Sequence, residues 1–304
     1  MNSAVIGIDV GGTKIAAGVA NFPDGAIGLR QTIPTQPERG GRAVLNDVLT
    51  LARKLASEAA QAGSPVACLG VGICELVTPE GKLASANCIK WLELPARDEI
   101  STIAPTVFEA DVRAAALGES LFGVAKQFRN FLYVTVGTGI SCCLVLDGEP
   151  YLGARGATGT MGSSPLSVPC EKCAHVSNRT LEEISAGPAL VARFNATGGN
   201  ARSGQEVLAS ATAGNAAATE IITSASQALE SQIALLVNTL DPEAVVIGGG
   251  LGLSEGAYWD QFIAATRRSI WSEMHRDLPI LRAKTGADAG WLGAAARAWM
   301  ETKA

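Results

Sequence analysis

The sequence is poor in charge, in histidine and in aromatic side chains. Charged residues make up 17% of the 304 residues, aromatic residues make up 5%, and only two histidines are present. The net charge is −5, and no block of lysine or arginine interrupts the chain. Because nucleic-acid binding depends on a basic surface, we expect no nucleic-acid partner.

Long apolar runs are also missing, and no stretch reaches the roughly 20 apolar residues of a membrane-spanning helix. The opening residues, MNSAVIGIDVGG, lack the basic segment, apolar core and cleavage site of a signal peptide. Seven cysteines, an odd number, fit a reducing compartment in which most of them are small core residues. We therefore expect a cytoplasmic protein with no membrane partner.

Two common nucleotide-binding fingerprints are absent as well. The chain has no G-x-G-x-x-G between a first strand and its helix, and no G-x-x-x-x-G-K-[ST] loop. It has instead two similar stretches, IGIDVGGTKIAAGV from residue 6 and LYVTVGTGISCCLVL from residue 132. Each pattern predicts a strand, a glycine turn and a second strand, and their similarity indicates two related halves.

Strand patterns joined by hairpins alternate with helical crossovers along the chain. This mixture predicts an α/β protein with mixed sheets, in two lobes. We expect a smaller N-terminal lobe over residues 1–120, completed by a C-terminal helix at about 288–304, and a larger lobe over 121–287. Residues 153–178 are rich in glycine, serine and proline and predict a long loop. A cleft between the lobes would suit a nucleotide and a second substrate.

The first glycine loop (residues 9–14) carries an aspartate at the end of a buried strand. A glycine pair lets backbone N–H groups approach a phosphate without intervening side chains, and the aspartate could hold Mg²⁺. The threonine and lysine that follow could bind a phosphate oxygen and offset its charge. The candidate nucleotide-binding residues of this loop are Asp9, Gly11, Gly12, Thr13 and Lys14. The alternative is a plain hairpin turn with an Asx cap.

The second glycine loop (residues 135–140) contains Gly137, Thr138 and Gly139, which are candidates for contact with the β- and γ-phosphates. A third glycine run follows a buried strand, and there Gly249 and Gly250 would let an adenine or ribose ring approach the backbone. Neither loop is specific alone. The two hairpin loops together favour a phosphate clamp.

Asp111 lies where a strand pattern ends and an alanine-rich helix begins. One interpretation is a helix N-cap. The other is a general base that takes the proton of an attacking hydroxyl during phosphoryl transfer, where orientation counts for more than basicity.

Taken in order, these segments resemble the ROK family (repressors, open reading frames, kinases) of the sugar kinase, actin and Hsp70 superfamily. The resemblance covers essentially the whole chain. Its motifs are IGIDVGGTKI at 6–15, GVGI at 70–73, SAN at 85–87, EADVRAAALGE at 109–119, TVGTGI at 135–140, LEEISAGPAL at 181–190, VVIGGGL at 245–251 and DAGWLGAA at 288–295.

The resemblance implies an actin-like (ribonuclease H-like) α/β fold and an ATP-dependent kinase that uses Mg²⁺ to phosphorylate a sugar hydroxyl. It makes Asp111 the catalytic base and makes Asn87 and Glu182 candidate sugar contacts. It also implies a homodimer, since dimers are common in this family.

Several positions depart from the family pattern. Ala110 and Arg113 replace two asparagines around the catalytic aspartate, and Cys74-Glu75 replaces Pro-Gly. Thr160 and Ser163 stand where a glutamate and a histidine commonly hold a hexose. We therefore take Glu75, Arg113, Thr160 and Ser163 as candidate substrate-binding residues. A site that has lost several hydroxyl partners favours a modified sugar, an amino sugar or a cyclitol over glucose or N-acetylglucosamine.

The family's zinc pattern is altered too. Cys170, Cys173 and His175 are three candidate zinc ligands, whereas a structural zinc takes four. A zinc site and a loop with two free thiols both stay open.

Other functions have less support in the sequence than a kinase. A regulator of the same family would carry a winged helix-turn-helix before the first glycine loop, where this chain has no room for it. An actin-like or chaperone ATPase lacks support, because no client module is recognisable. A glucokinase-like hexose kinase and a catalytically weak sugar sensor stay as alternatives.

Overall fold

The structure is a computed structural model that describes residues 3–169, 176–255 and 257–303. The chain divides into two compact units. Unit 1 comprises Met1–Arg129, Cys143–Thr158 and Ala283–Ala304, and unit 2 comprises Asn130–Cys142 and Gly159–Arg282. Within the described residues, no helix has both the length and the apolar character that crossing a membrane requires.

Unit 1 contains a five-stranded mixed sheet in the order β3-β2-β1-β4-β5. The first three strands are antiparallel, while β1, β4 and β5 run parallel. The strands are β1 (Ser3–Val10), β2 (Lys14–Phe22), β3 (Ala26–Pro34), β4 (Val66–Ile73) and β5 (Thr106–Ala110).

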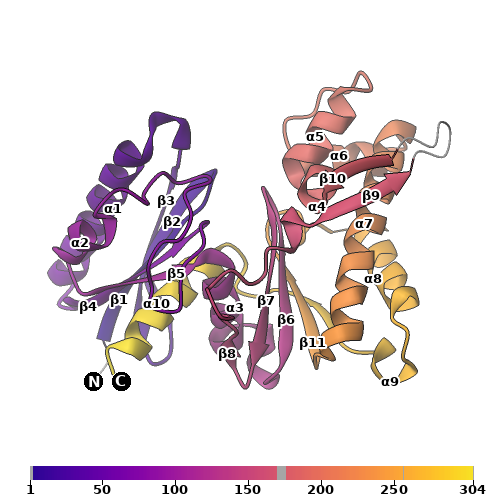
Figure 1. Cartoon of the computed structure of the whole chain (residues 1–304). Coiled ribbons are helices and arrows are strands. Elements are labelled where there is room, and N and C mark those ends of the chain that lie inside the picture. The colour runs from indigo at the N-terminus through magenta and orange to yellow at the C-terminus, as the bar shows by residue number, and fades with distance from the viewer. Residues whose placement is uncertain (1–2, 170–175, 256, 304) are drawn as a thin grey trace. The chain divides into compact units, whose positions relative to one another are not determined.

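Helices cover both faces of this sheet (Figure 1). The apolar stripe of α1 (Gly41–Gln61) packs on alternate residues of β1, such as Ile6 and Ile8, with α2 (Ala96–Ser101) beside it. On the other face lie α3 (Asp111–Phe122) and α10 (Ala289–Glu301). Because side chains of a strand alternate between faces, β1 can serve both layers.

Backbone packs directly on backbone where α10 crosses the sheet. A Cβ atom on Gly7 of β1 would lie 1.8 Å from the Trp291 carbonyl oxygen, and one on Gly70 of β4 would lie 1.9 Å from that of Ala294. Only glycine fits at these two positions, so the sheet and the helix approach more closely than side chains would allow.

The second sheet has the order β12-β11-β6-β7-β8. Read from its far edge, this order repeats that of the first sheet, with the β6–β7 hairpin in the place of β1–β2. Its strands are β6 (Phe131–Val136), β7 (Ile140–Leu146), β8 (Glu149–Pro150), β11 (Ala244–Gly248) and β12 (Ile280–Arg282). The boundary between the units falls within β7, between Cys142 and Cys143.

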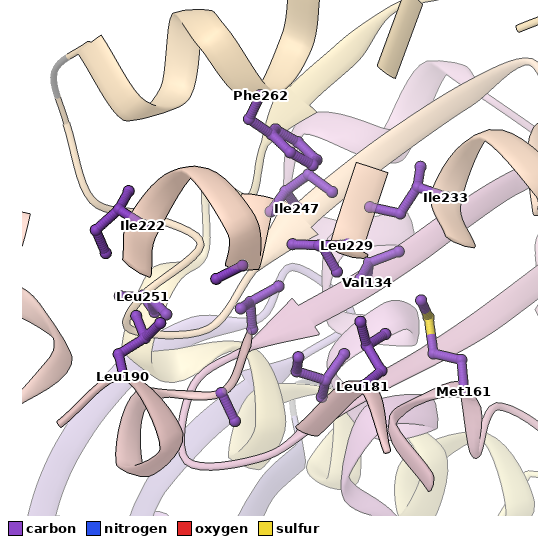
Figure 2. Packing of buried hydrophobic residues seen from close by; sticks show 14 of the residues in the cluster. Val134, Met161, Leu181, Leu190, Ile222, Leu229, Ile233, Ile247, Leu251 and Phe262 are labelled. Carbon is purple, nitrogen blue, oxygen red and sulfur yellow. The ribbon is translucent and has the colours of Figure 1, made fainter. Parts of the chain in front are cut away.

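Unit 2 buries a core between its strands and its long helix α7 (Ala216–Leu240). Figure 2 shows Leu229 and Ile233 of this helix against Val134 of β6 and Ile247 of β11, with Phe262 of α8 alongside. The other elements are short or peripheral: β9 (Pro165–Pro169), β10 (Val176–Thr180), α4 (Leu181–Ser185), α5 (Gly187–Asn195), α6 (Gly204–Thr212), α8 (Ala257–Ser269) and α9 (Glu273–Arg276). Single 3₁₀ turns complete the chain: η1 (Pro37–Arg39), η2 (Val124–Gln127), η3 (Met161–Ser163) and η4 (Gly286–Asp288).

Two expectations differ from the structure. Residues 153–178 were expected to form one long loop, yet β9 and β10 pair within and beside this range. Residues 143–158, which the sequence boundaries put in the second lobe, belong to unit 1, and unit 1 is the larger unit. The physical reason is local: the β7–β8 turn is tied to unit 1 by the Gly148 N–H to the Arg129 carbonyl (2.8 Å) and by the Arg297–Glu149 ion pair (3.0 Å).

Candidate active site

Three parallel strands of unit 1 end at one edge of their sheet. Asp9 of β1 is in register with Gly72 of β4, which is in register with Glu109 of β5. Cys74 follows the end of β4, and Asp111 follows the end of β5. The carboxyl ends of parallel strands therefore bring Asp9, Cys74 and Asp111 to the same edge, where α/β proteins place their ligands.

Asp9 is a half-buried carboxylate without a full set of partners. Its Oδ1 is buried and has no hydrogen-bond partner, while its Oδ2 lies against the backbone of Gly290 at the start of α10, 2.4 Å from where a Cβ would stand. Burial raises the pKa of Asp9 to about 7; the charge of Asp111 acts in the same direction and Lys14 opposes it. A buried carboxylate oxygen that lacks a donor is suited to a cation.

Asp111 opens α3 but does not cap it. The N-cap is Ala110, and no side chain makes a capping hydrogen bond. Asp111 Oδ1 accepts a hydrogen bond of 2.6 Å from the Val112 N–H. Burial raises the pKa of Asp111 to about 6, with the charge of Glu75 adding to the shift and the Val112 N–H and Arg113 opposing it. The plain N-cap interpretation is therefore wrong for the side chain, which is a carboxylate with a pKa close to neutral.

Thr35 holds the backbone of the first glycine loop through two hydrogen bonds. This fully buried residue donates from Oγ1 to the Gly11 carbonyl (2.6 Å) and from its N–H to the Thr13 carbonyl (3.0 Å). Gly11 N–H closes the turn on the Lys14 carbonyl at 3.1 Å, and Lys14 is exposed. A Cβ on Gly12 would lie 3.1 Å from Cys88 Sγ.

Glu75 holds the loop that carries Asn87. Its carboxylate accepts hydrogen bonds from the backbone N–H groups of Asn87 (2.8 Å), Cys88 (2.6 Å) and Ile89 (2.7 Å), and from the hydroxyl of Ser85. Only 6% of Glu75 is exposed. Its polar atoms are engaged with the protein, while Asn87, which was expected to contact the sugar, has an exposed side chain.

Arg113 is likewise occupied within unit 1. It is 2% exposed and donates to the Glu109 carboxylate (2.6 Å), the Gly156 carbonyl (3.1 Å) and the Val77 carbonyl (2.7 Å). Glu75 and Arg113 were both expected to face the substrate as new charges. In the structure each side chain is buried and holds the loops around the site through hydrogen bonds. A buried charge is stable only when it has such partners.

Unit 2 places two further glycine segments beside the second glycine loop. The Gly187 N–H donates to the Gly137 carbonyl at 2.8 Å, and Gly137 N–H donates to the Gly139 carbonyl at 2.9 Å. A Cβ on Gly249 would lie 2.4 Å from the Val136 carbonyl oxygen. Gly250, whose carbonyl accepts from Gln205 Nε2 at 3.0 Å, follows in the same turn.

Glu182, expected as a sugar contact, supports the second glycine loop. Its Oε1 accepts from the Ile140 N–H at 2.7 Å and lies 2.7 Å from where a Cβ on Gly139 would stand. Thr160 and Ser163 have exposed side chains on the following turn. That turn packs on β7 through Gly159, where a Cβ would lie 1.8 Å from the Cys142 carbonyl oxygen. Glu182 and the turn that carries Thr160 and Ser163 therefore belong to one corner of unit 2.

Cys170, Cys173 and His175 lie outside the described residues, so the zinc prediction stays open. Among the residues that the structure does describe, no group of three or more His, Cys, Asp or Glu side chains could hold a metal ion. This does not conflict with magnesium, which typically takes one or two carboxylates together with water and substrate phosphates.

Several site residues gave no signal in the sequence. Thr35 lies outside every motif, while Ser85 and Glu109 lie in the SAN and EADVRAAALGE motifs, which do not reveal the hydrogen bonds that these residues make. Cys74 could have been noticed, since it replaces a proline of the family pattern beside another departure at Glu75. The contact of Cys74 with Cys88 depends on the loop that Glu75 holds.

Several named proteins to which this chain is similar are carbohydrate kinases. An N-acetylmannosamine kinase from Vibrio vulnificus (strain CMCP6) is 31% identical over 257 residues, which cover 83% of this chain and 84% of the relative. The bifunctional enzyme NanE/NanK of Brucella suis is 28% identical over 301 residues and 97% of this chain. This chain spans about half of that relative's length, 53%.

Among solved structures, a ROK family glucokinase from Streptomyces griseus, in complex with glucose and AMPPNP, superimposes with a TM-score of 0.82. It is 27% identical, and the match covers 98% of this chain and 100% of that one. The expected actin-like α/β fold class is confirmed. The model of the ROK family matches residues 5–301. The chain thus belongs to the ROK family.

Proposed function

We propose that this protein is an ATP-dependent carbohydrate kinase that transfers a phosphoryl group to a hydroxyl of an amino sugar or another modified sugar. One observation carries the proposal: Asp9 and Asp111, each with a raised pKa, share the edge of one sheet beside a glycine loop. Titratable groups perturbed by burial and by each other's charge are typical of catalytic sites.

Asp111 is the proposed general base. It accepts the proton of the substrate hydroxyl as that oxygen attacks the terminal phosphoryl group. A pKa of about 6 lets it be ionised at neutral pH and still hold a proton in the transition state. The Val112 N–H fixes one carboxylate oxygen and thereby orients the other. Since the transition state of phosphoryl transfer is loose, this orientation matters more than base strength.

Asp9 is the proposed ligand for Mg²⁺, directly or through water. Its buried Oδ1 has no hydrogen-bond donor, so a cation would satisfy it. When bound, magnesium neutralises charge on the phosphates. The protein's part is to keep this carboxylate ionised and in place, which Lys14 and the packing against Gly290 support.

The glycine loops are the proposed phosphate-binding elements. Gly11, Gly12, Thr13 and Lys14 of the first loop and Gly137, Thr138 and Gly139 of the second each present backbone without bulky side chains. Gly249 and Gly250 are proposed to lie near the nucleoside. The Streptomyces griseus glucokinase binds an ATP analogue, AMPPNP, which supports ATP as the donor.

The substrate is proposed to be recognised by Asn87, Glu182, Thr160 and Ser163, while Glu75 and Arg113 act indirectly by holding loops. The N-acetylmannosamine kinase relative acts on an amino-sugar derivative, and this supports an amino sugar here. Glucose is the second candidate, because the Streptomyces griseus relative is a glucokinase with glucose bound.

A panel of sugars tests the proposal. Release of ADP from MgATP is measured with N-acetylmannosamine, other amino sugars, glucose and a cyclitol, using Asp111→Asn protein as the control. The proposal expects ADP release with at least one modified or amino sugar and a lower kcat/KM for glucose. Glucose as the best substrate would favour the hexose kinase. Sugar binding without ADP release would show a sensor.

A homodimer, a cytoplasmic location and a bound zinc stay predictions. Trp271 and Met274 are exposed by 86% and 98%, and large apolar side chains at a surface are candidates for a subunit contact. Light scattering would give the mass of the particle, and elemental analysis of the purified protein would give its zinc content.

A further inference from the structure

Two cysteines lie together beside the first glycine loop. Cys74 follows β4, and Cys88 lies in the loop held by Glu75; both are reduced and half-buried. Their side chains are hydrogen-bonded to each other. The other described cysteines, Cys68, Cys142 and Cys143, are buried.

Each sulfur is attached to backbone that shapes the site. Cys74 N–H donates to the Val10 carbonyl at 3.1 Å, directly after Asp9. Cys88 N–H donates to Glu75 Oε1 at 2.6 Å, and Cys88 Sγ lies 3.1 Å from a Cβ position on Gly12. The pair therefore joins the end of β4, the loop of Asn87 and the first glycine loop.

The pair has the properties of a reactive dithiol. Its exposure distinguishes it from a core packing pair, and the part of the chain that the structure describes holds no third metal ligand beside it. The hydrogen bond from Cys74 lowers the pKa of Cys88 to about 7, with Lys90 helping and burial, Glu75 and Asp111 opposing. Cys88 is thus the better nucleophile of the two, since the thiolate is the reactive form.

We propose that Cys74 and Cys88 are a reversible thiol-oxidation site, and that their disulfide lowers the rate of phosphoryl transfer. The oxidant is a low-molecular-weight disulfide of the glutathione class. Intracellular disulfides are usually of this transient, redox-sensing kind.

The chemistry proceeds in two exchanges. The Cys88 thiolate attacks one sulfur of the small disulfide, forms a mixed disulfide and releases one small thiolate, which takes up a proton. Cys74 then loses its proton to solvent and attacks Cys88 Sγ, which releases the second small thiolate. Two protein thiols are oxidised to one disulfide, and the small disulfide is reduced to two thiols.

The effect on turnover follows from the geometry. A disulfide holds its sulfurs about 2.05 Å apart, much closer than a hydrogen-bonded pair. Closing this distance moves Cys88 Sγ relative to Gly12 and moves the loop of Asn87 relative to β4. A displacement of about 1 Å in a positioning element can cost on the order of 100-fold in rate. This effect rests on the proposed kinase function, whereas the disulfide itself does not.

The experiment incubates the full chain with oxidised glutathione, blocks the remaining thiols and digests the protein with trypsin. Cleavage after Lys82 separates Cys74, in peptide 55–82, from Cys88, in peptide 83–90. Cys68 lies in the first peptide as well, so a Cys68→Ser variant makes Cys74 the only cysteine there. We expect the two peptides to be joined in the wild type and in Cys68→Ser, and separate in Cys74→Ser and Cys88→Ser.

Turnover is measured on the same samples, each variant against its own untreated protein. We expect kcat/KM to fall by about 10-fold or more in the wild type and in Cys68→Ser, to recover with dithiothreitol, and to stay unchanged in Cys88→Ser, which lacks the attacking thiol. Glutathione retained on Cys88 with no joined peptides would overturn the disulfide. Joined peptides with unchanged turnover would overturn its effect. If the reduced protein has no kinase activity, the proposed function fails, and the joined peptides still decide the disulfide.

Discussion

The two glycine loops stand at equivalent places in sheets of equivalent order, yet they carry different chemistry. Counting back from the first glycine, Asp9 of the first loop corresponds to Thr135 of the second. The Asp9 carboxylate has a buried oxygen without a donor, whereas Thr135 Oγ1 lies against Gly249 of the neighbouring turn, 2.7 Å from where a Cβ would stand. A repeated backbone frame therefore supports a charged site in one unit and a neutral one in the other.

Their supports differ in the same way. Beside the first loop, the Glu75 carboxylate accepts four hydrogen bonds. Beside the second loop, Glu182 accepts one from the Ile140 N–H, and the Gly187 N–H donates to the Gly137 carbonyl. The comparison teaches that the proposed proton and metal chemistry belongs to unit 1, while unit 2 presents backbone. The predictions below test that division.

The largest effect is expected for Asp111→Asn. This change keeps the shape of the side chain but removes the proton acceptor, so kcat should fall by about 10²–10⁴-fold while nucleotide binding persists. Steady-state kinetics and nucleotide titration measure the two quantities. Unchanged turnover would remove Asp111 as the base and would end the assignment of the chemistry to unit 1.

The supports of the two loops should differ in their contribution to stability. Glu75→Ala leaves three backbone N–H groups near the site without their acceptor, and we expect it to lower the free energy of unfolding by about 3 kcal/mol. Glu182→Ala removes one acceptor and should cost about 1–2 kcal/mol. Denaturant titration compares them, and a larger loss for Glu182→Ala would reverse the comparison.

Replacing Asp9 of the first loop and Thr135 of the second by alanine compares the contributions of the two loops to catalysis. Asp9→Ala should lower kcat/KM for MgATP by about 10²-fold, since it removes the proposed magnesium ligand. Thr135→Ala, its matched control, should cost only about threefold, as expected for one neutral hydrogen-bonding group. Equal losses in the two variants would show that the loops share the metal.

Lowering the pH is expected to give the smallest effect on kcat/KM. Because the base must be ionised, kcat/KM should fall about tenfold per pH unit below the pKa of Asp111, about 6. Stability should move the opposite way. The folded state raises the pKa of both aspartates from 3.8. Each carboxyl therefore adds its full contribution to the free energy of unfolding below pH 3.8, and this contribution is lost as the pH rises through about 6 to 7.

The double variant Asp9→Asn, Asp111→Asn checks this sign. Its Tm should exceed that of the wild type at pH 8 in the absence of magnesium, and the difference should vanish near pH 4. A wild-type activity that stays constant down to pH 5 would contradict the assignment of a raised pKa to the base.

The sequence predicted the two glycine hairpins, the alanine-rich helix that begins at Asp111 and the C-terminal helix, because periodicity and glycine turns are local signals. The β9–β10 pair was missed, since its strands are short and polar, and the place of residues 143–158 depends on contacts with Arg129 and Arg297.

The roles of charged residues were harder to predict than their positions. Glu75 and Arg113 differ from the family pattern, and a new charge near a site suggests a substrate contact. Their partners are backbone groups, Ser85 and Glu109, and the sequence does not reveal these contacts. Burial decides what a charged side chain does, and burial follows from the whole fold.

The close contact of Gly7 and Gly70 with α10 has a consequence for how the protein is made. The sheet of unit 1 emerges early from the ribosome, but the helix that covers one of its faces is synthesised after all of unit 2. During translation α3 alone covers part of that apolar face, while unit 2 can already complete its own core. The nascent chain is therefore most exposed to aggregation and to chaperones in its first-made half.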